Sequence, residues 1–299
     1  MDYYNNNLLL AVEGFLRNMS SVEAPFMVKG SILTRQFFPP SVVRLVQDMD
    51  LVYLENIEDE GMAEDIFSTW LIQVTTNNQD TKVWFRSFEE NRFWRSIDYA
   101  MNDDFPTTNT DLYCKLEDGT VIDPFDLDIS FNLDIDFPPE EMLYKPLFGP
   151  PFILKKVCPY ALQVSWKLHQ LLVRPRLKDI FDLIYLLQQE HFKEGELEKI
   201  VFALKKECKR DGISAGQLLP YINGKLAREK EELKVRKPTY VETLLKGNKE
   251  PFNPNILIET DYKYFTTPAS FPFTKHSELL RALQERLVAV GFKEQLLLR

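Results

Sequence analysis

Residues 26–54 constrain the fold more than any other part of the sequence. This segment opens with the apolar run Phe26-Met27-Val28, breaks at Gly30-Ser31, and ends at Asp48-Met49-Asp50 followed by a second apolar run. The order is typical of a strand, a tight turn, a helix, a loop and another strand, with Pro39-Pro40 in the loop. It predicts two strands of one sheet, with a pair of carboxylates at the start of the second.

The carboxylate pair is suited to holding a metal ion. Side chains two positions apart on a strand point to the same face and lie roughly 6.5 Å apart, at about 3.3 Å per residue. Asp48 and Asp50 can therefore hold a common divalent cation, while Met49 and Leu51 face the core. The alternative interpretation is an ordinary pair of exposed acids at the beginning of a strand.

The turn that precedes this strand is suited to binding phosphate. Gly30 allows the backbone to approach a ligand closely. Ser31 can cap the following helix, or bind an anion together with the free N–H groups there. A phosphate cradle beside a metal-binding carboxylate pair is what nucleotidyl transfer requires.

Composition excludes several other kinds of protein. With 299 residues and 44% hydrophobic content, the chain is long enough for two domains. Its three histidines argue against a histidine triad or a histidine-rich zinc site, and its three cysteines are far apart and lack metal-ligand spacing. No stretch approaches the ~20 apolar residues of a membrane span, and the N-terminus lacks a signal-peptide pattern. We expect a reduced, cytoplasmic protein.

The two halves of the chain carry opposite charge. Residues 1–150 contain 10 Lys and Arg against 27 Asp and Glu, a net charge of −17, whereas residues 151–299 contain 26 against 18, a net charge of +8. An acidic half could hold metal, and a basic half could hold polyphosphate or nucleic acid. The alternative is that both halves merely have solvated charged faces.

The rest of the first half reads as a mixture of helices and strands. Helices are predicted at residues 8–19, 62–74 and 90–101, a strand at 82–88, a loop at 103–110, and a hairpin at 112–122 around Asp118-Gly119. Residues 125–131 alternate strictly, with Asp126, Asp128 and Ser130 on one face. Asp128 is the candidate for a third metal-binding carboxylate, with Asp126 as the alternative; a half-buried strand with one wet face would show the same pattern.

A cluster of prolines at residues 146–151 suggests a domain boundary at 150, and the pattern beyond it is helical. Helices are predicted at residues 160–173, 178–192, 195–210, 215–235, 240–245 and 277–298, with an irregular connection at 249–273.

A second group of charged residues lies in the first two of these helices. Asp179 and Asp182 are three residues apart and share a face of a strongly apolar helix, where acids are costly unless they are paired or face a polar cleft. In the functional interpretation Lys167 binds the triphosphate, and Asp182 or Asp179 orients it or the acceptor. In the structural interpretation these acids form an ion-pair cluster with the nearby cations, namely Lys167, Arg174, Arg176 and Lys178.

Together the two segments resemble the AbiEii family of toxin nucleotidyltransferases, whose members include the MenT-type toxins of mycobacteria. The matching residues are Val28-Lys29-Gly30-Ser31, Asp48-Met49-Asp50-Leu51, Leu127-Asp128-Ile129-Ser130, Lys167-Leu168-His169, Arg174 and Lys178-Asp179-Ile180-Phe181-Asp182-Leu183. Sixteen residues separate Ser31 from Asp48, which is longer than the usual gap, and we expect the Pro39-Pro40 loop to absorb the excess.

The resemblance implies a polymerase-β-like nucleotidyltransferase fold with a helical C-terminal part. It implies transfer of a nucleotide from an NTP with Mg²⁺ (or Mn²⁺), in MenT-type members to the 3′ end of tRNA, and an antitoxin encoded beside the toxin. By position, Gly30 and Ser31 would cradle the triphosphate, Asp48 and Asp50 would hold the metal, Lys167 would contact phosphates, and Asp182 or Asp179 would complete the site.

The sequence therefore predicts an α+β protein in two domains. Residues 1–150 would form a small mixed sheet with helices that carries the metal site, and residues 151–299 would form a helical domain that completes the nucleotide and acceptor site. Two other functions remain open: nucleotidylation of a protein hydroxyl, and a non-catalytic module that binds nucleotide or a partner on the same fold.

Overall fold

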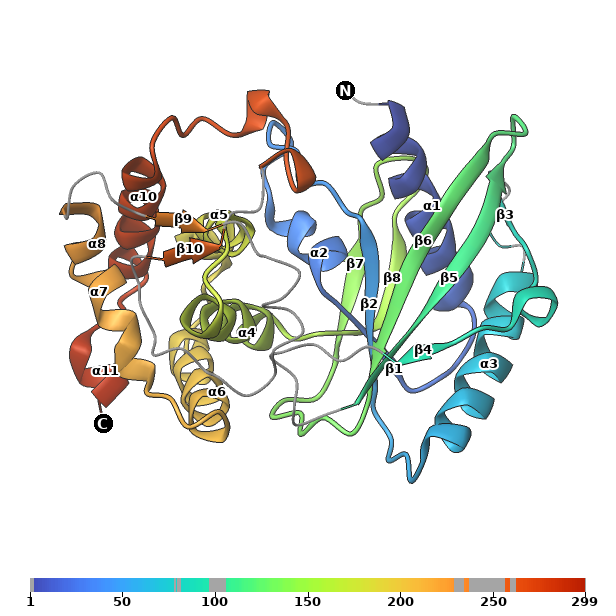
Figure 1. Ribbon diagram of the computed structural model, residues 1–299, viewed down its shortest axis with the longest axis horizontal. Coiled ribbons are helices and arrows are strands. Elements are labelled where there is room, and N and C mark those ends of the chain that lie inside the picture. The colour runs from blue at the N-terminus through green and yellow to red at the C-terminus, as the bar shows by residue number, and fades with distance from the viewer. Residues whose placement is uncertain are drawn as a thin grey trace. The chain divides into compact units, whose positions relative to one another are not determined.

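The computed structural model describes residues 3–77, 79, 82–96, 106–228, 234–236, 256–258 and 262–298. The chain forms two compact units (Figure 1). The first comprises Met1–Gln36 and Arg44–Pro159, and the second comprises Phe37–Val43 and Tyr160–Arg299. In the described part of the chain, no helix combines the length and hydrophobicity needed to cross a bilayer.

The first unit is built on a mixed sheet of eight strands, in the order β3-β5-β6-β2-β1-β8-β7 with β4 paired to β5 (Figure 1). Strand β2 runs parallel to β6, and β1 parallel to β8, while the other pairs are antiparallel. The elements are α1 (Tyr3–Ser20), β1 (Phe26–Lys29), α2 (Ser31–Thr34), β2 (Asp48–Tyr53), α3 (Glu60–Thr76), β3 (Val83–Phe85), β4 (Arg95–Ser96), β5 (Thr107–Leu116), β6 (Val121–Ser130), β7 (Glu140–Tyr144) and β8 (Phe152–Val157). The predicted α+β class is confirmed.

The apolar face of this sheet packs against α1 and α3. Phe15 on α1 meets the rings of Trp70 on α3 and Phe125 on β6 edge-on, with centroids 6.0 and 6.3 Å apart. The alternating side chains of β2 and β6 that share this face are fully buried: Met49, Leu51, Leu127 and Ile129. Because side chains alternate along a strand, Asp48, Asp50, Asp126 and Asp128 lie on the opposite face. The alternation predicted from the sequence is confirmed in both strands.

Two predictions for the first unit are wrong. A 3-10 helix (Phe88–Asn91) and strand β4 occupy the described part of the helix predicted at 90–101; residues 97–101 lie outside the described residues. The loop predicted at 103–110 is strand β5 from Thr107 onward, because the run of threonines pairs with β6. Strands β7 and β8 were not predicted, and the proline cluster at 146–151 is the connection between them.

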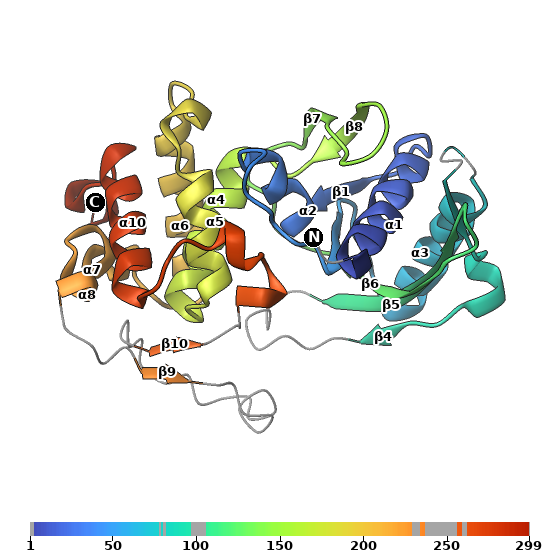
Figure 2. The ribbon, with the colours of Figure 1, turned by 90° about the horizontal axis from the view of Figure 1, so that it is seen from above.

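The second unit is mainly helical. Helix α4 packs against α5 and α6, while α7, α8 and α10 gather at one end of the unit (Figure 2). The elements are α4 (Tyr160–Val173), α5 (Leu177–Leu186), α6 (Glu196–Arg210), α7 (Leu219–Ile222), α8 (Lys225–Arg228), β9 (Lys234–Arg236), β10 (Ile256–Ile258), α10 (His276–Ala289) and α11 (Glu294–Leu298). The bounds predicted for α4 are confirmed.

Other helices of this unit are shorter than predicted. The helix predicted at 178–192 ends at Leu186, and the one at 215–235 divides into a 3-10 turn, α7, α8 and strand β9. The helix predicted at 277–298 breaks at Gly291, whose φ of +97° lets Phe292 N–H donate to the carbonyl of Leu287 at 3.0 Å. The helix predicted at 240–245 lies outside the described residues.

Residues 37–43 are part of the second unit although they lie between α2 and β2 in sequence. Phe38 packs against Phe181 and Tyr185 of α5, with ring centroids 5.5 and 4.4 Å apart. The carbonyl of Val43 accepts a hydrogen bond of 2.6 Å from Thr266 Oγ1. The long gap between Ser31 and Asp48 is therefore ordered structure that contributes to the helical unit.

Candidate active site

A row of polar side chains crosses five neighbouring strands on the face of the sheet opposite α1. Lys29 on β1 pairs with Asp50, Asp50 with Asp128 on β6, Asp128 with Asn109 on β5, and Asn109 with Arg95 on β4. Directly paired residues in a sheet place their side chains on the same side, close enough to interact. We call this set the cross-strand row.

A second row runs beside it, two residues along each strand. Asp48 pairs with Asp126, and Asp126 with Asp111. We call the side of the sheet that bears both rows the carboxylate face. The sequence places the acids of the two rows far apart in the chain, and the parallel pairing of β2 with β6 brings them together.

The turn at Gly30 lies against the carboxylate of Asp50. Gly30 has a φ of +79°, which favours glycine, and a Cβ at this position would overlap the side chain of Asp50. The tight approach between turn and carboxylate therefore requires glycine. Ser31 Oγ lies 3.5 Å from Asp48 Oδ1.

Of the two roles considered for Ser31, capping of the helix is not the one found. Helix α2 has only four residues, its N-cap is Gly30, and its end is secured by Thr34, whose N–H and hydroxyl both donate to the Gly30 carbonyl at 3.1 Å. Ser31 instead turns its hydroxyl toward Asp48, so the turn and the carboxylate pair form one local structure.

Asp128 and Asp126 have different surroundings. Asp128 is only 7% exposed and accepts a hydrogen bond from Asn109 Nδ2. Asp126 is more exposed, and Arg95 Nη1 lies 3.6 Å from its Oδ1. Burial and the neighbouring Asp111 raise the pKa of Asp126, against the effect of Arg95. Both candidates for the third carboxylate are thus on the carboxylate face.

The carboxylate face suits a hard divalent cation. Within the described ranges, no group of three or more His, Cys, Asp or Glu side chains is arranged to hold an ion by itself. Mg²⁺, however, is usually bound through one or two carboxylates together with substrate phosphates, and it keeps several waters. Asp48 and Asp50 supply the oxygen donors beside the Gly30 turn, so the residues fit Mg²⁺ or Mn²⁺ bound with a nucleotide.

The second group of predicted residues forms a buried ion-pair cluster in the second unit. Lys167 Nζ on α4 lies 3.2 Å from Asp179 Oδ1 and 2.8 Å from Asp182 Oδ2 on α5, and both carboxylates are fully buried. Arg176 Nε donates to Asp179 Oδ2 at 2.6 Å. Burial acts to raise the pKa of Asp179, but Arg176 and Lys167 outweigh it and hold this pKa well below its usual range.

Arg174 is not part of this buried ion-pair cluster. Among the described residues its guanidinium makes no ion pair, and burial together with the neighbouring Arg176 lowers its pKa. The ion-pair interpretation of this segment therefore holds for Lys167, Arg176, Asp179 and Asp182, and the charge of Lys178 also helps to lower the pKa of Asp179. An ion pair does not exclude a role in phosphate binding, since the side chain of Lys167 is 16% exposed.

The predicted residues thus fall into two groups. Gly30, Ser31, Asp48, Asp50 and Asp128 come together in the first unit. Lys167, Asp179 and Asp182 come together in the second. That both groups meet around one triphosphate stays a prediction.

Two residues of the cross-strand row were missed in the sequence. Asn109 lies in the segment predicted to be a loop, and Arg95 in the segment predicted to be a helix. The β-branched residues Thr107, Thr108 and Thr110 are a weak strand signal, but the register that places Asn109 opposite Asp128 comes only from the pairing of β5 with β6.

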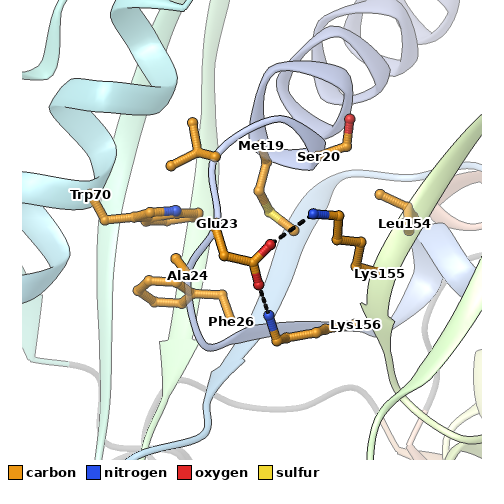
Figure 3. Close-up of a pocket in the computed structure, with 10 residues that line it drawn as sticks. Met19, Ser20, Glu23, Ala24, Phe26, Trp70, Leu154, Lys155 and Lys156 are labelled. Carbon is orange, nitrogen blue, oxygen red and sulfur yellow. Dashed lines mark hydrogen bonds and ion pairs between the residues drawn. The ribbon is translucent and has the colours of Figure 1, made fainter.

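A small cavity elsewhere in the first unit does not offer a substrate site. It has a volume of about 20 Å³, room for about one water, and is bounded by α1, α3 and β8 (Figure 3). Glu23 bridges Lys155 and Lys156 at 2.8 and 2.6 Å beside it, and these cations lower the pKa of Glu23 to about 2. Trp70 and Phe26 stack on its other side, with centroids 3.9 Å apart.

Solved structures of similar fold are known. MenT4, a nucleotidyltransferase toxin from Mycobacterium tuberculosis H37Rv, is similar with a TM-score of 0.51 and 12% identity, over 98% of this chain and 87% of that one. JHP933 from Helicobacter pylori is similar with a TM-score of 0.47 and 12% identity, over 97% of this chain and 93% of that one. The likeness to MenT4 shows that the fold is that of a nucleotidyltransferase.

The family follows from the sequence match. The model of the family described as nucleotidyl transferase AbiEii toxin, Type IV TA system, matches residues 19–263. The chain belongs to this family and is a nucleotidyltransferase toxin. No sequence among the curated proteins matches it.

Proposed function

We propose that this nucleotidyltransferase moves a nucleotide from an NTP to the 3′ end of tRNA in a Mg²⁺-dependent reaction that releases pyrophosphate. The observation that carries the proposal is the placement of Asp48 and Asp50 on one face of the sheet, directly beside the glycine turn at Gly30. A turn that brings bare backbone against a carboxylate pair offers both a phosphate contact and a cation site.

Each residue has a proposed part in positioning the reactants. Asp48 and Asp50 hold the cation, with a further carboxylate on β6. When bound, Mg²⁺ would neutralise triphosphate charge and polarise the acceptor hydroxyl. Gly30 and Ser31 contact the triphosphate, Lys167 binds its phosphates, and Asp182 or Asp179 keeps Lys167 oriented. The chain forms no covalent bond to substrate in this scheme, so catalysis rests on positioning and charge stabilisation.

The proposed acceptor is tRNA because the second half of the chain is basic. Its net charge of +8 favours binding of a polyanion. The first half, with a net charge of −17, would repel a polyanion except near a bound cation. We further propose that the protein acts in the cytoplasm and that a cognate antitoxin counteracts it, as the description of its family as a toxin–antitoxin system indicates.

Labelled nucleotides test the proposal directly. The protein is incubated with each of the four α-labelled NTPs, total tRNA and tRNA-free lysate protein, with Mg²⁺ or EDTA. Label at the 3′ end of tRNA, lost with EDTA and with D48N, is the expected result. Label in lysate protein would instead establish nucleotidylation of a protein hydroxyl. Nucleotide binding without pyrophosphate release in every mixture would overturn the proposed reaction.

A growth assay tests the proposed partner. Expression of the wild-type chain should arrest growth, while D48N should not. Co-expression of the neighbouring antitoxin gene should restore growth. Arrest by D48N equal to wild type would separate toxicity from nucleotidyl transfer.

A further inference from the structure

We propose that Asn109 and Arg95 position Asp128 as the third carboxylate of the metal site, with Arg95 acting through Asn109. The proposal rests on the proposed function, because it concerns the cation that Asp48 and Asp50 hold. It adds two positioning residues from strands β4 and β5, and it chooses Asp128 over Asp126.

Burial makes Asp128 depend on its neighbour. At 7% exposure, its carboxylate has lost most of its contact with water, and an ionised carboxylate in that state needs hydrogen-bond donors. Asn109, itself only 2% exposed, donates to Oδ1 of Asp128 through Nδ2. This hydrogen bond limits rotation of the Asp128 side chain.

Arg95 determines which way the Asn109 amide points. An asparagine amide has a donor end and an acceptor end, and rotation by half a turn exchanges them. Arg95 Nη1, which can only donate, lies 2.7 Å from Asn109 Oδ1. The oxygen of the amide is therefore held toward Arg95, and its NH₂ group is left facing Asp128.

Arg95 is in turn held by several contacts. It forms an ion pair with Asp111, lies 3.6 Å from Asp126, and places its guanidinium 5.4 Å from the centre of the Phe93 ring. These contacts also explain the choice between the two β6 acids. Asp126, which pairs with Asp48, lies beside the Arg95 guanidinium, whereas Asp128, which pairs with Asp50, accepts from the neutral amide of Asn109.

Asn109 contacts the proposed metal ligand Asp128, and Arg95 contacts Asn109, as residues that orient a metal ligand do. Residues that orient metal ligands typically change metal affinity or activity 10–100-fold when replaced. A merely structural Asn109 would change the stability of the sheet without a matching change in cation affinity. The two roles can therefore be separated by measuring cation binding itself.

The test measures Mn²⁺ binding to the full-length protein by EPR, in the presence of a non-hydrolysable NTP analogue. Asn109→Leu and Arg95→Met should each raise the Kd for Mn²⁺ about tenfold. The double variant should resemble Asn109→Leu alone, since Arg95 acts through Asn109. Arg92→Met is the matched control: it removes a nearby arginine that pairs with Asp65 at 2.7 Å, and it should leave the Kd unchanged.

The outcomes distinguish this inference from the proposed function. If wild type binds no Mn²⁺, or if Asp48→Asn binds it as well as wild type, the metal assignment itself is wrong. If Asp48→Asn loses binding while both Asn109→Leu and Arg95→Met bind like wild type, the positioning role alone is refuted. Should Asn109→Leu fail to fold, Arg95→Met decides, because the side chain of Arg95 is 39% exposed and its replacement should leave the protein folded.

Discussion

Lys167 Nζ on α4 lies 2.8 Å from the fully buried Oδ2 of Asp182 on α5. The lysine that is proposed to bind phosphate is thus also a partner in a buried ion pair. Its removal affects stability as well as chemistry, so a loss of activity in a Lys167 variant has two possible sources.

The first prediction separates these two sources. Lys167→Met should lower the free energy of unfolding by about 3 kcal/mol, because it leaves buried carboxylates without one of their cations. The double variant K167M/D182N removes charge from both sides and should recover much of that loss. Urea denaturation at pH 7 measures both effects.

Activity of the double variant then tests the chemistry. If Lys167 contacts the triphosphate, K167M/D182N should be folded and still inactive. Nucleotide transfer by this variant at the wild-type rate would show that Lys167 is only structural.

The second prediction concerns the turn at Gly30. Gly30→Ala should reduce transfer by about 100-fold, because its Cβ would displace the Asp50 carboxylate and an electrostatic contact at a reacting centre is worth roughly that much. Gly119→Ala is a matched control: Gly119 also has positive φ, at +84°, but has no neighbouring atom within 4 Å of an added Cβ. It should cost about 1 kcal/mol of stability and leave transfer unchanged. Equal activity of the two variants would contradict the proposed role of the turn.

The third prediction concerns the carboxylate pair. Asp48→Asn and Asp50→Asn should each lower the transfer rate by at least about 100-fold and should shift the Mg²⁺ dependence to higher concentration. Asp123→Asn, at an exposed position of β6, should match wild type in both respects. Rates measured across a Mg²⁺ titration check this, and wild-type rates for D48N and D50N would remove the basis for the cation site.

The fourth prediction follows from the lowered pKa of Asp179. A carboxyl group whose pKa is lower in the folded than in the unfolded state stabilises the protein above the unfolded pKa, about 3.9, and this contribution is lost as pH falls toward the folded pKa. Asp179→Asn should therefore be less stable than wild type at pH 7 and pH 5. The difference should shrink as pH falls below about 4. Urea denaturation at several pH values measures it, and a difference that grows toward low pH would have the wrong sign.

The elements with strong periodicity were predictable from sequence, and those formed by pairing were not. Helix α4 has a continuous apolar stripe and is followed by Arg174-Pro175-Arg176, so both of its ends could be located. Strand β5 begins with polar threonines beside Pro106, and only its pairing with β6 makes that segment a strand. Its polar composition favoured a loop when read without its partner.

The same difference between local patterns and strand pairing decides which residues of the candidate site could be predicted from sequence. Asp48 and Asp50 could be assigned because their spacing and the preceding glycine turn are local features of the sequence. Asn109 and Arg95 could not, because their relation to Asp128 depends on the register of three strands. The acids of α5 could be recognised as unusual from their apolar context, but only the structure identifies which cations contact them.

The placement of residues 37–43 has a consequence for dissecting the molecule. A polypeptide starting at Tyr160 would lack Phe38, whose ring completes an aromatic group with Phe181 and Tyr185. A polypeptide ending at Pro159 would carry that phenylalanine with nothing to bury it. A single cut in the gene therefore cannot separate the two units without dividing the second one.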